Sequence, residues 1–224
     1  MSQEKNLTNH TPLPLGGVGG GLHRKLHTIE MQRLTVEEFR QAEKLPLIVV
    51  LDDVRSLYNV GSVFRTCDAF RVEAIYLCGI TATPPHNEIH KTALGAEDSV
   101  SWRHFDTADE AVEELHRQGY FVYAVEQAEG STKAPLGPLP NPPQRGGGQS
   151  CEQTSLKASP KGGGMEGATF AVVLGNEVKG VHQSVVDACD DCLEIPQFGT
   201  KHSMNVSVTA GIVIWEFARQ LLRL

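Results

Sequence analysis

The stretch Pro46-Leu47-Ile48-Val49-Val50-Leu51-Asp52 decides the fold class of this 224-residue chain. Five apolar residues follow one another without alternation, bounded by a proline on one side and by two aspartates on the other. An uninterrupted apolar run of this length is typical of a strand buried on both faces of a parallel sheet. We therefore expect residues 47–51 to form a central strand.

Strands and helices are predicted to alternate on both sides of this run. A helix is expected to begin after Thr35, because Glu38 stands at the capping-box spacing. Further helices are expected over residues 59–70, 87–96 and 107–118 and from about Ser203 to the C-terminus, and further strands over 72–78, 99–105, 120–125, 169–174 and 192–195. This alternation predicts an α/β fold with a mainly parallel sheet flanked by helices.

Two glycine-rich regions fall outside the alternation. Residues 1–22 lack apolar periodicity, so we expect a disordered tail. Residues 23–45 are predicted to form a short basic and helical extension in front of one domain over 46–224. Within that domain, residues 135–164 are so rich in glycine and proline that they cannot form a packed core, and we expect a flexible insertion.

Composition restricts the functional classes. The formal net charge of −7 argues against broad nucleic-acid binding, although basic residues gather near the start of the chain and in the insertion. The five cysteines are scattered and odd in number, no leading charged-then-apolar segment is present, and no apolar run approaches the roughly 20 residues that span a bilayer. We expect a reduced, cytoplasmic protein that does not enter a membrane.

Three polar segments follow predicted strands, at the positions where open α/β sheets bind ligands. The first, residues 51–65, contains Asn59, Gly61 and Arg65. Taken alone, Asn59 would be a helix cap and Arg65 a surface cation. The second, residues 172–181, lacks the Lys-Ser/Thr pair that completes a phosphate loop, which leaves a turn able to present backbone amides to an adenosine-like ligand.

The third segment, residues 194–212, concentrates hydroxyl, amide and small residues at the start of a helix that otherwise has the pattern of a buried one. Buried polar groups need partners. They either satisfy neighbouring backbone groups or bind a ligand, and a core built only for stability would not need so many.

Together, in this order, the three segments resemble the signature motifs of the SpoU family of RNA ribose 2′-O-methyltransferases, the TrmH-like branch of the SPOUT superfamily. The resemblance covers residues 46–224 apart from the insertion. The matching positions are Asn59, Gly61 and Arg65 in the first motif, Gly175, Glu177 and Gly180 in the second, and Ile195, Pro196, Ser203, Asn205, Val206 and Ser207 in the third. Met204 stands where leucine is commoner, an exchange of similar volume.

The resemblance implies a SPOUT fold with a deep trefoil knot near the C-terminus, a homodimer with the active site near the subunit interface, and S-adenosyl-L-methionine (AdoMet) as methyl donor, without a metal. The substrate would be the ribose 2′-hydroxyl of a tRNA or rRNA. By position, the cofactor-binding residues would be Leu174, Gly175, Ile195 and Met204. The catalytic residues would be Asn59, Arg65, Glu177, Ser203 and Asn205.

Several alternatives stay open at this point. Arginine remains protonated in proteins and is a poor general base, so Arg65 is expected to grip a target phosphate and stabilise developing oxyanion charge. His202 is either a base or a solvent-facing loop histidine. Trp102 and Trp215 are expected in the core. A non-catalytic RNA-binding or assembly protein that retains the fold is the rival function.

Overall fold

The computed structural model of the chain describes residues 24–140 and 168–224. The expected disordered tail (1–22) and residues 141–164 of the expected insertion lie outside the described residues. The chain divides into two compact units, Met1–Leu34 and Thr35–Leu224. In the described part of the smaller unit, a single 3₁₀ turn, η1 (Thr28–Met31), lies beside an ion pair of 2.8 Å between Arg24 and Glu30.

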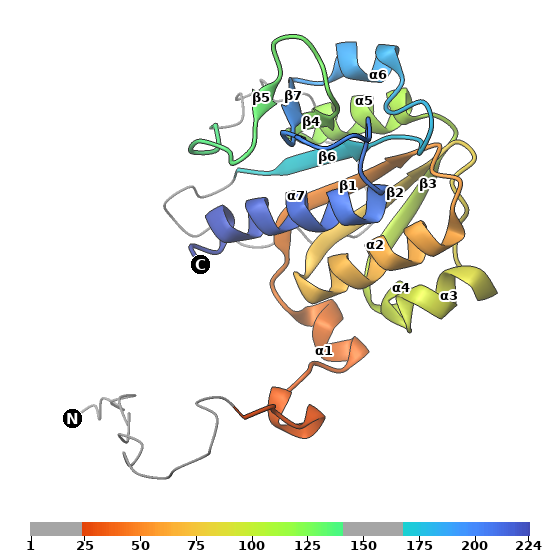
Figure 1. Ribbon diagram of the computed structural model, residues 1–224. Coiled ribbons are helices and arrows are strands. Elements are labelled where there is room, and N and C mark those ends of the chain that lie inside the picture. The colour runs from red at the N-terminus through yellow and green to blue at the C-terminus, as the bar shows by residue number, and fades with distance from the viewer. Residues whose placement is uncertain (1–23, 141–167) are drawn as a thin grey trace, which may run out of the picture. The chain divides into compact units, whose positions relative to one another are not determined.

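The larger unit contains a seven-stranded sheet in the order β3-β2-β1-β6-β4-β7-β5. Every ladder between these strands is parallel (Figure 1). The strands are β1 (Leu45–Asp52), β2 (Val72–Cys78), β3 (Ser101–Phe105), β4 (Phe121–Val125), β5 (Thr132–Lys133), β6 (Phe170–Leu174) and β7 (Asp191–Glu194). The predicted parallel α/β sheet is confirmed, whereas the trefoil knot stays a prediction.

Helices cover both faces of this sheet. They are α1 (Val36–Gln41), α2 (Leu57–Ala69), α3 (Asn87–Ala93), α4 (Ala96–Ser99), α5 (Ala108–Gln118), α6 (Gln183–Ala188) and α7 (Val206–Leu221). Helices α2 and α7 lie against one face, and α5 and α6 against the other (Figure 1). Within β1, Val49 belongs to the first core and Val50 to the second, so the strand is buried on both faces as its apolar run predicts.

Some local predictions are confirmed and others are wrong. Thr35 caps α1 through the expected capping box with Glu38. The helix expected over 87–96 is broken into α3 and α4, because Leu94 and Gly95 both adopt positive φ angles of 54° and 94°. Trp215 is not a core residue, since 47% of it is exposed on the outer side of α7.

Neither a membrane-spanning helix nor a disulfide is present among the described residues. None of their helices is both long and apolar enough to cross a bilayer. Four cysteines lie in this part of the chain, and all four are free thiols.

The strand register brings distant parts of the chain to one edge of the sheet. Leu174 at the end of β6 pairs with Leu51 near the end of β1 and with Val125 at the end of β4. Val125 in turn pairs with Leu193 in β7. Because parallel strands end at the same edge, the segments that follow β1, β4, β6 and β7 all emerge side by side.

We predict opposite stability effects for two glycine-to-alanine substitutions. At Gly61, where α2 packs on α3, a Cβ would overlap the Thr92 hydroxyl and the Ile89 carbonyl oxygen, so Gly61→Ala should destabilise the fold by about 1–3 kcal/mol. At Gly137, in the segment after β5, a Cβ would meet open space and φ is not positive, so Gly137→Ala should stabilise the fold by up to about 1 kcal/mol. Urea denaturation measures both, and equal effects would contradict the packing argument.

Candidate functional site

A pocket of about 780 Å³ lies where the strand ends meet. Its wall is formed by residues from the segment after β4, the turn after β6, and the loop from β7 to α7. Six of the nine predicted site residues line it: Leu174, Gly175, Glu177, Ile195, Ser203 and Met204. These six include all the residues predicted to bind the cofactor.

The carboxylate of Glu177 fastens the turn after β6 to the start of α2. It accepts hydrogen bonds of 3.0 Å from the backbone N–H groups of Arg55 and Ser56 and from Nδ2 of Asn59. Burial alone would raise the pKa of Glu177, but these three donors together hold the pKa below its ordinary value. Glu177 is therefore an anchoring carboxylate in its ionised form.

The side chain of Asn59 links this anchor to α7. Its Nδ2 donates to Glu177, and its Oδ1 accepts a hydrogen bond of 3.1 Å from Nδ2 of Asn205. Ser56, and not Asn59, is the N-cap of α2. The interpretation of Asn59 as a simple helix cap is therefore wrong.

Asn205 forms hydrogen bonds with two helices at once, α7 and α2. Its Oδ1 caps α7 by accepting from the backbone N–H groups of Ser207 and Val208, while its Nδ2 donates to Asn59. A chain of hydrogen bonds thus runs from Glu177 through Asn59 to Asn205. One residue from each of the three sequence motifs belongs to it.

Arg65 does not lie with the other predicted catalytic residues. It is exposed on α2, in an open hollow that Lys91 and Thr92 of α3 also line. Across residues 24–140 and 168–224, its guanidinium makes no hydrogen bond or ion pair. Within a single copy of the chain, Arg65 is therefore separate from the pocket wall.

Two glycines shape the turn that lines the pocket. A Cβ on Gly175 would overlap the backbone of Gly180. Gly180 has a φ of +71°, and a Cβ there would overlap the carboxylate of Glu126. The backbone needs glycine at both positions, because this tight turn closes with an antiparallel bridge between Asn176 and Gly180.

Two residues that the motif comparison did not single out also hold the turn in place. Oε2 of Glu126 accepts from the backbone N–H of Val181 at 3.1 Å. Nδ2 of Asn176 donates to the carbonyl oxygen of Asp53 at 2.7 Å. Glu126 directly follows β4, so the rule that predicted polar side chains after strands could have found it.

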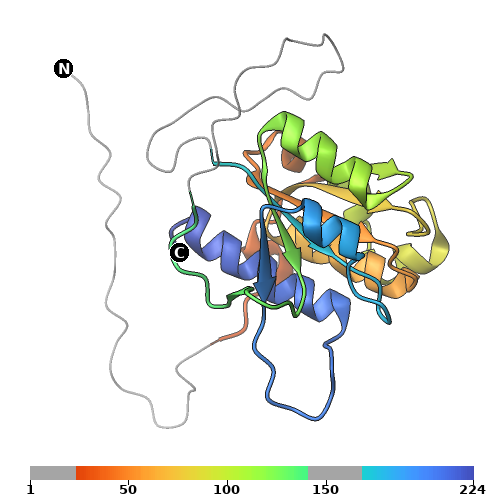
Figure 2. The same cartoon turned by 90° about the horizontal axis from the view of Figure 1, so that it is seen from above.

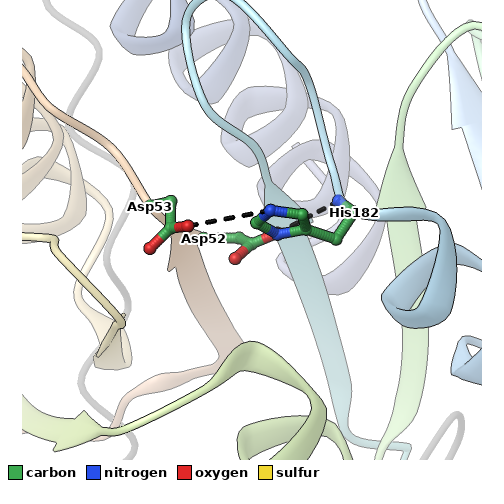
Figure 3. A group of neighbouring side chains, drawn as sticks. All are labelled: Asp52, Asp53 and His182. Atoms are coloured by element: carbon green, nitrogen blue, oxygen red, sulfur yellow. Dashed lines mark hydrogen bonds and ion pairs between the residues drawn. The ribbon is translucent and has the colours of Figure 1, made fainter.

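His182 holds the far end of the same turn, where it lies close to two carboxylates (Figure 3). Its backbone N–H and its ring Nδ1 lie 3.2 Å and 3.0 Å from Oδ2 of the buried Asp52. Its Nε2 lies 3.7 Å from Oδ2 of Asp53. Asp52, Asp53 and His182 are close enough to bind one metal ion. Both ring nitrogens of His182, however, already lie near a carboxylate oxygen of these two aspartates.

The loop from β7 to α7 also lines the pocket. The side-chain amide of Gln127 donates to the carbonyl oxygen of His202 at 2.7 Å, which ties this loop to the segment after β4. His202 lines the pocket and is exposed. Of the charged side chains in the pocket wall most are acidic, namely Glu126, Glu129, Glu177 and Asp187, against Lys179.

We predict a pH-dependent cost for Glu177→Gln. The pKa of Glu177 in the folded protein lies below its ordinary value of 4.5. The ionised carboxylate therefore stabilises the fold at pH values above 4.5, and this stabilisation is lost as the pH falls through the folded-state pKa. The substitution should lower the free energy of unfolding by about 1–2 kcal/mol at pH 7 and by much less at pH 3.

Denaturation by urea at both pH values measures this difference. Glu129→Gln, which removes another carboxylate from the same pocket wall, is the matched control and should cost little at either pH. A cost for Glu177→Gln that does not change with pH would contradict the anchoring role of the ionised group.

Comparison with known proteins places this geometry in a family. A sequence model of the SpoU rRNA Methylase family matches residues 46–215. An uncharacterized tRNA/rRNA methyltransferase of Borreliella burgdorferi is 26% identical over 197 residues, which are 88% of this chain and 73% of that protein. The 23S rRNA (guanosine-2′-O-)-methyltransferase RlmB of Neisseria meningitidis is 28% identical over 180 residues, 78% of this chain but only 59% of that protein.

Solved structures share the fold. The TrmH/SpoU tRNA modifying enzyme of A. aeolicus superposes with a TM-score of 0.64 at 22% identity, covering 84% of this chain and 83% of that one. The AdoMet-bound rRNA methyltransferase of Sinorhizobium meliloti gives a TM-score of 0.63 at 22% identity, covering 82% of this chain and 60% of that one. With the family match spanning most of the sequence, the chain belongs to the SpoU rRNA methylase family.

Proposed function

We propose that this chain transfers a methyl group from AdoMet to a ribose 2′-hydroxyl of tRNA or rRNA. The observation that carries the proposal is the placement of all four predicted cofactor residues in one pocket, with the hydrogen-bonded chain of Glu177, Asn59 and Asn205 linking its wall to α2 and α7. Family membership supports it, and so does the printed activity of the Neisseria relative.

The pocket suits AdoMet in size, apolarity and charge. Its volume of about 780 Å³ lies in the range of about 300–1,000 Å³ that is usual for small-molecule sites. Leu174, Ile195 and Met204 supply apolar surface for an adenine ring. The acidic side chains in the wall favour a ligand with a positively charged sulfonium and ammonium. Bound there, AdoMet supplies a methyl group on a cationic sulfur.

The residues of the chain then have to position the ribose and allow the proton of its 2′-hydroxyl to leave. Ser203 lines the pocket and is exposed, so we assign it the orientation of the 2′-hydroxyl. Asn59 and Asn205 hold one another, and together with Glu177 they fix the two segments that border the hydroxyl. As the oxygen–methyl bond forms and the sulfur–methyl bond breaks, the hydroxyl proton must leave.

We assign Arg65 an indirect role in the removal of that proton, through a phosphate of the RNA. A guanidinium cannot accept a proton at neutral pH, but it can bind a phosphate of the RNA with two parallel hydrogen bonds. In this scheme the phosphate oxygen passes the hydroxyl proton on to water, and the cation stabilises the charge that develops on the 2′-oxygen. The open position of Arg65 on α2 leaves its guanidinium available for such a ligand.

A homodimer would complete the site. Arg65 lies apart from the pocket of its own chain, so we propose that it faces the pocket of a partner subunit. The outer side of α7 supports an interface, because Val208, Ile212 and Trp215 are 40–53% exposed and recur at spacings of four and three residues. Such a spacing places all three on one face of the helix.

We predict that Arg65→Ala lowers methyl transfer by about 100-fold or more and leaves AdoMet affinity unchanged, because the charge acts on the transition state. Arg65→Lys should recover little, since lysine lacks the planar fork. The measurement is transfer of labelled methyl to total tRNA and to rRNA separately, with calorimetry for AdoMet. Arg117→Ala, on the opposite face of the sheet, is the control.

In the same experiment, AdoMet binding without methyl transfer by the wild-type protein to either RNA would favour the non-catalytic alternative. Label recovered in a 2′-O-methylated nucleotide would identify the reaction and the RNA class. Transfer by Arg65→Lys near the wild-type rate would contradict the need for a bidentate phosphate clamp.

We predict that two inactive variants complement one another if the site spans two subunits. Co-expressed Arg65→Ala and Asn205→Ala chains form heterodimers with one intact site, which gives about a quarter of wild-type activity after random pairing. The control pair, Asn59→Ala with Asn205→Ala, damages the same half-site and should recover nothing. No recovery in the first pair would place Arg65 and Asn205 in the same half-site.

A further inference from the structure

Phe198 is the most exposed large apolar residue in the described parts of the chain, at 97%. A single exposed apolar side chain is common on protein surfaces and needs no explanation by itself. What distinguishes Phe198 is its position in the loop between β7 and α7. Gln197 on one side and His202 on the other both line the pocket.

The loop holds Phe198 outside the pocket wall. It projects from the body of the larger unit between β7 and α7 (Figure 2). Residues 198–201 at its tip are all exposed, whereas both ends of the loop line the pocket. The hydrogen bond from Gln127 to the carbonyl oxygen of His202 ties its returning end to the body. The ring therefore lies on a loop that borders the pocket, and it is not part of the pocket wall.

The neighbours of Phe198 favour a nucleobase over a protein as its partner. Residues 197–203 read Gln-Phe-Gly-Thr-Lys-His-Ser, with one cation, one imidazole and no carboxylate. A core of a protein interface gathers several apolar side chains, and this stretch has only one. An aromatic ring beside a cation is instead the combination that binds unpaired bases and their phosphates.

The turn after β6 carries a second exposed apolar residue next to a lysine. Val178, in the turn after β6, is 80% exposed, and the exposed Lys179 follows it. Two segments that border the pocket thus each carry an exposed apolar residue and a lysine, Val178 with Lys179 and Phe198 with Lys201. Most charged groups in the pocket wall are carboxylates, so Lys179 and Lys201 are the cations of these two segments that attract an RNA phosphate.

We propose that Phe198 stacks on an unpaired nucleobase next to the target ribose, with Lys201 near the adjoining phosphate, so that the substrate is RNA whose modified nucleotide lies in a single-stranded loop or end. This rests on the proposed function, because the ribose is the one that enters the AdoMet pocket. Stacking needs an unstacked base, and a continuous duplex offers none.

The test measures binding of a fluorescein-labelled single-stranded RNA 12-mer of mixed sequence to the full-length protein in the presence of AdoMet. Phe198→Ala should weaken binding about 5- to 100-fold, the usual effect of removing one stacking side chain. Phe198→Trp should bind as the wild type does, whereas Phe198→Leu should resemble Phe198→Ala. Leu94→Ala, which shortens an exposed apolar side chain elsewhere, is the control and should change nothing.

An abasic 12-mer separates stacking from other contacts. Wild-type protein and Phe198→Ala should bind it equally, because the ring has no base to contact. The same 12-mer annealed into a duplex should also bind both proteins equally. A defect of Phe198→Ala that persists with abasic or duplex RNA would overturn the proposal.

Three controls identify the other roles that Phe198 could have. Equal binding by Phe198→Leu and wild type would indicate a general apolar contact and overturn stacking. Loss of the dimer mass in Phe198→Ala would make the residue a subunit contact. A lower AdoMet affinity would make it part of the cofactor site.

Failure of the proposed function itself would be seen in a different measurement. The wild-type protein would then transfer no methyl group to RNA but would still bind the 12-mer through Phe198.

Discussion

The parallel pairing of β6 with its neighbours β1 and β4 is the constraint on which the site depends. The register that sets Leu174 opposite Leu51 and Val125 is fixed by side chains buried on both faces of the sheet. A parallel ladder ends all its strands at one edge, so it delivers the polar segments after β1, β4 and β6 to the same place. The anchor of Glu177 on residues 55–59 can form only after this pairing exists.

The turn after β6 is held by side chains from several directions, and this redundancy is what makes it a rigid wall. Glu177 fastens it to α2, Glu126 to β4, and His182 to the end of β1. Each contact fixes backbone that would otherwise be free to move, and glycine at positions 175 and 180 allows the close approach. A ligand pocket formed by such a turn is organised before the ligand arrives, which reduces the entropy cost of binding.

The strong elements of the fold could be predicted from the sequence, because their patterns are local. The strand expected over 72–78 matches β2 residue for residue, and Thr35 caps its helix as its spacing indicates. The two-residue strand β5 and the six-residue helix α6 are too short to carry a periodic signal. Trp215 shows another limit, since an apolar helix does not reveal which of its faces packs inward.

The site residues, like the elements of the fold, could be predicted where the pattern is local and not where it depends on tertiary contacts. Motif spacing identified Asn59, Glu177 and Asn205, which the fold brings together through hydrogen bonds. A local rule could have marked Glu126 as a polar residue after a strand, but its contact with Val181, like that of Asp52 with His182, depends on which strands are neighbours. Arg65 depends on a larger scale still. It lies apart from the pocket wall of its own chain, so its proposed role in methyl transfer depends on contact between two chains and not on the fold of one.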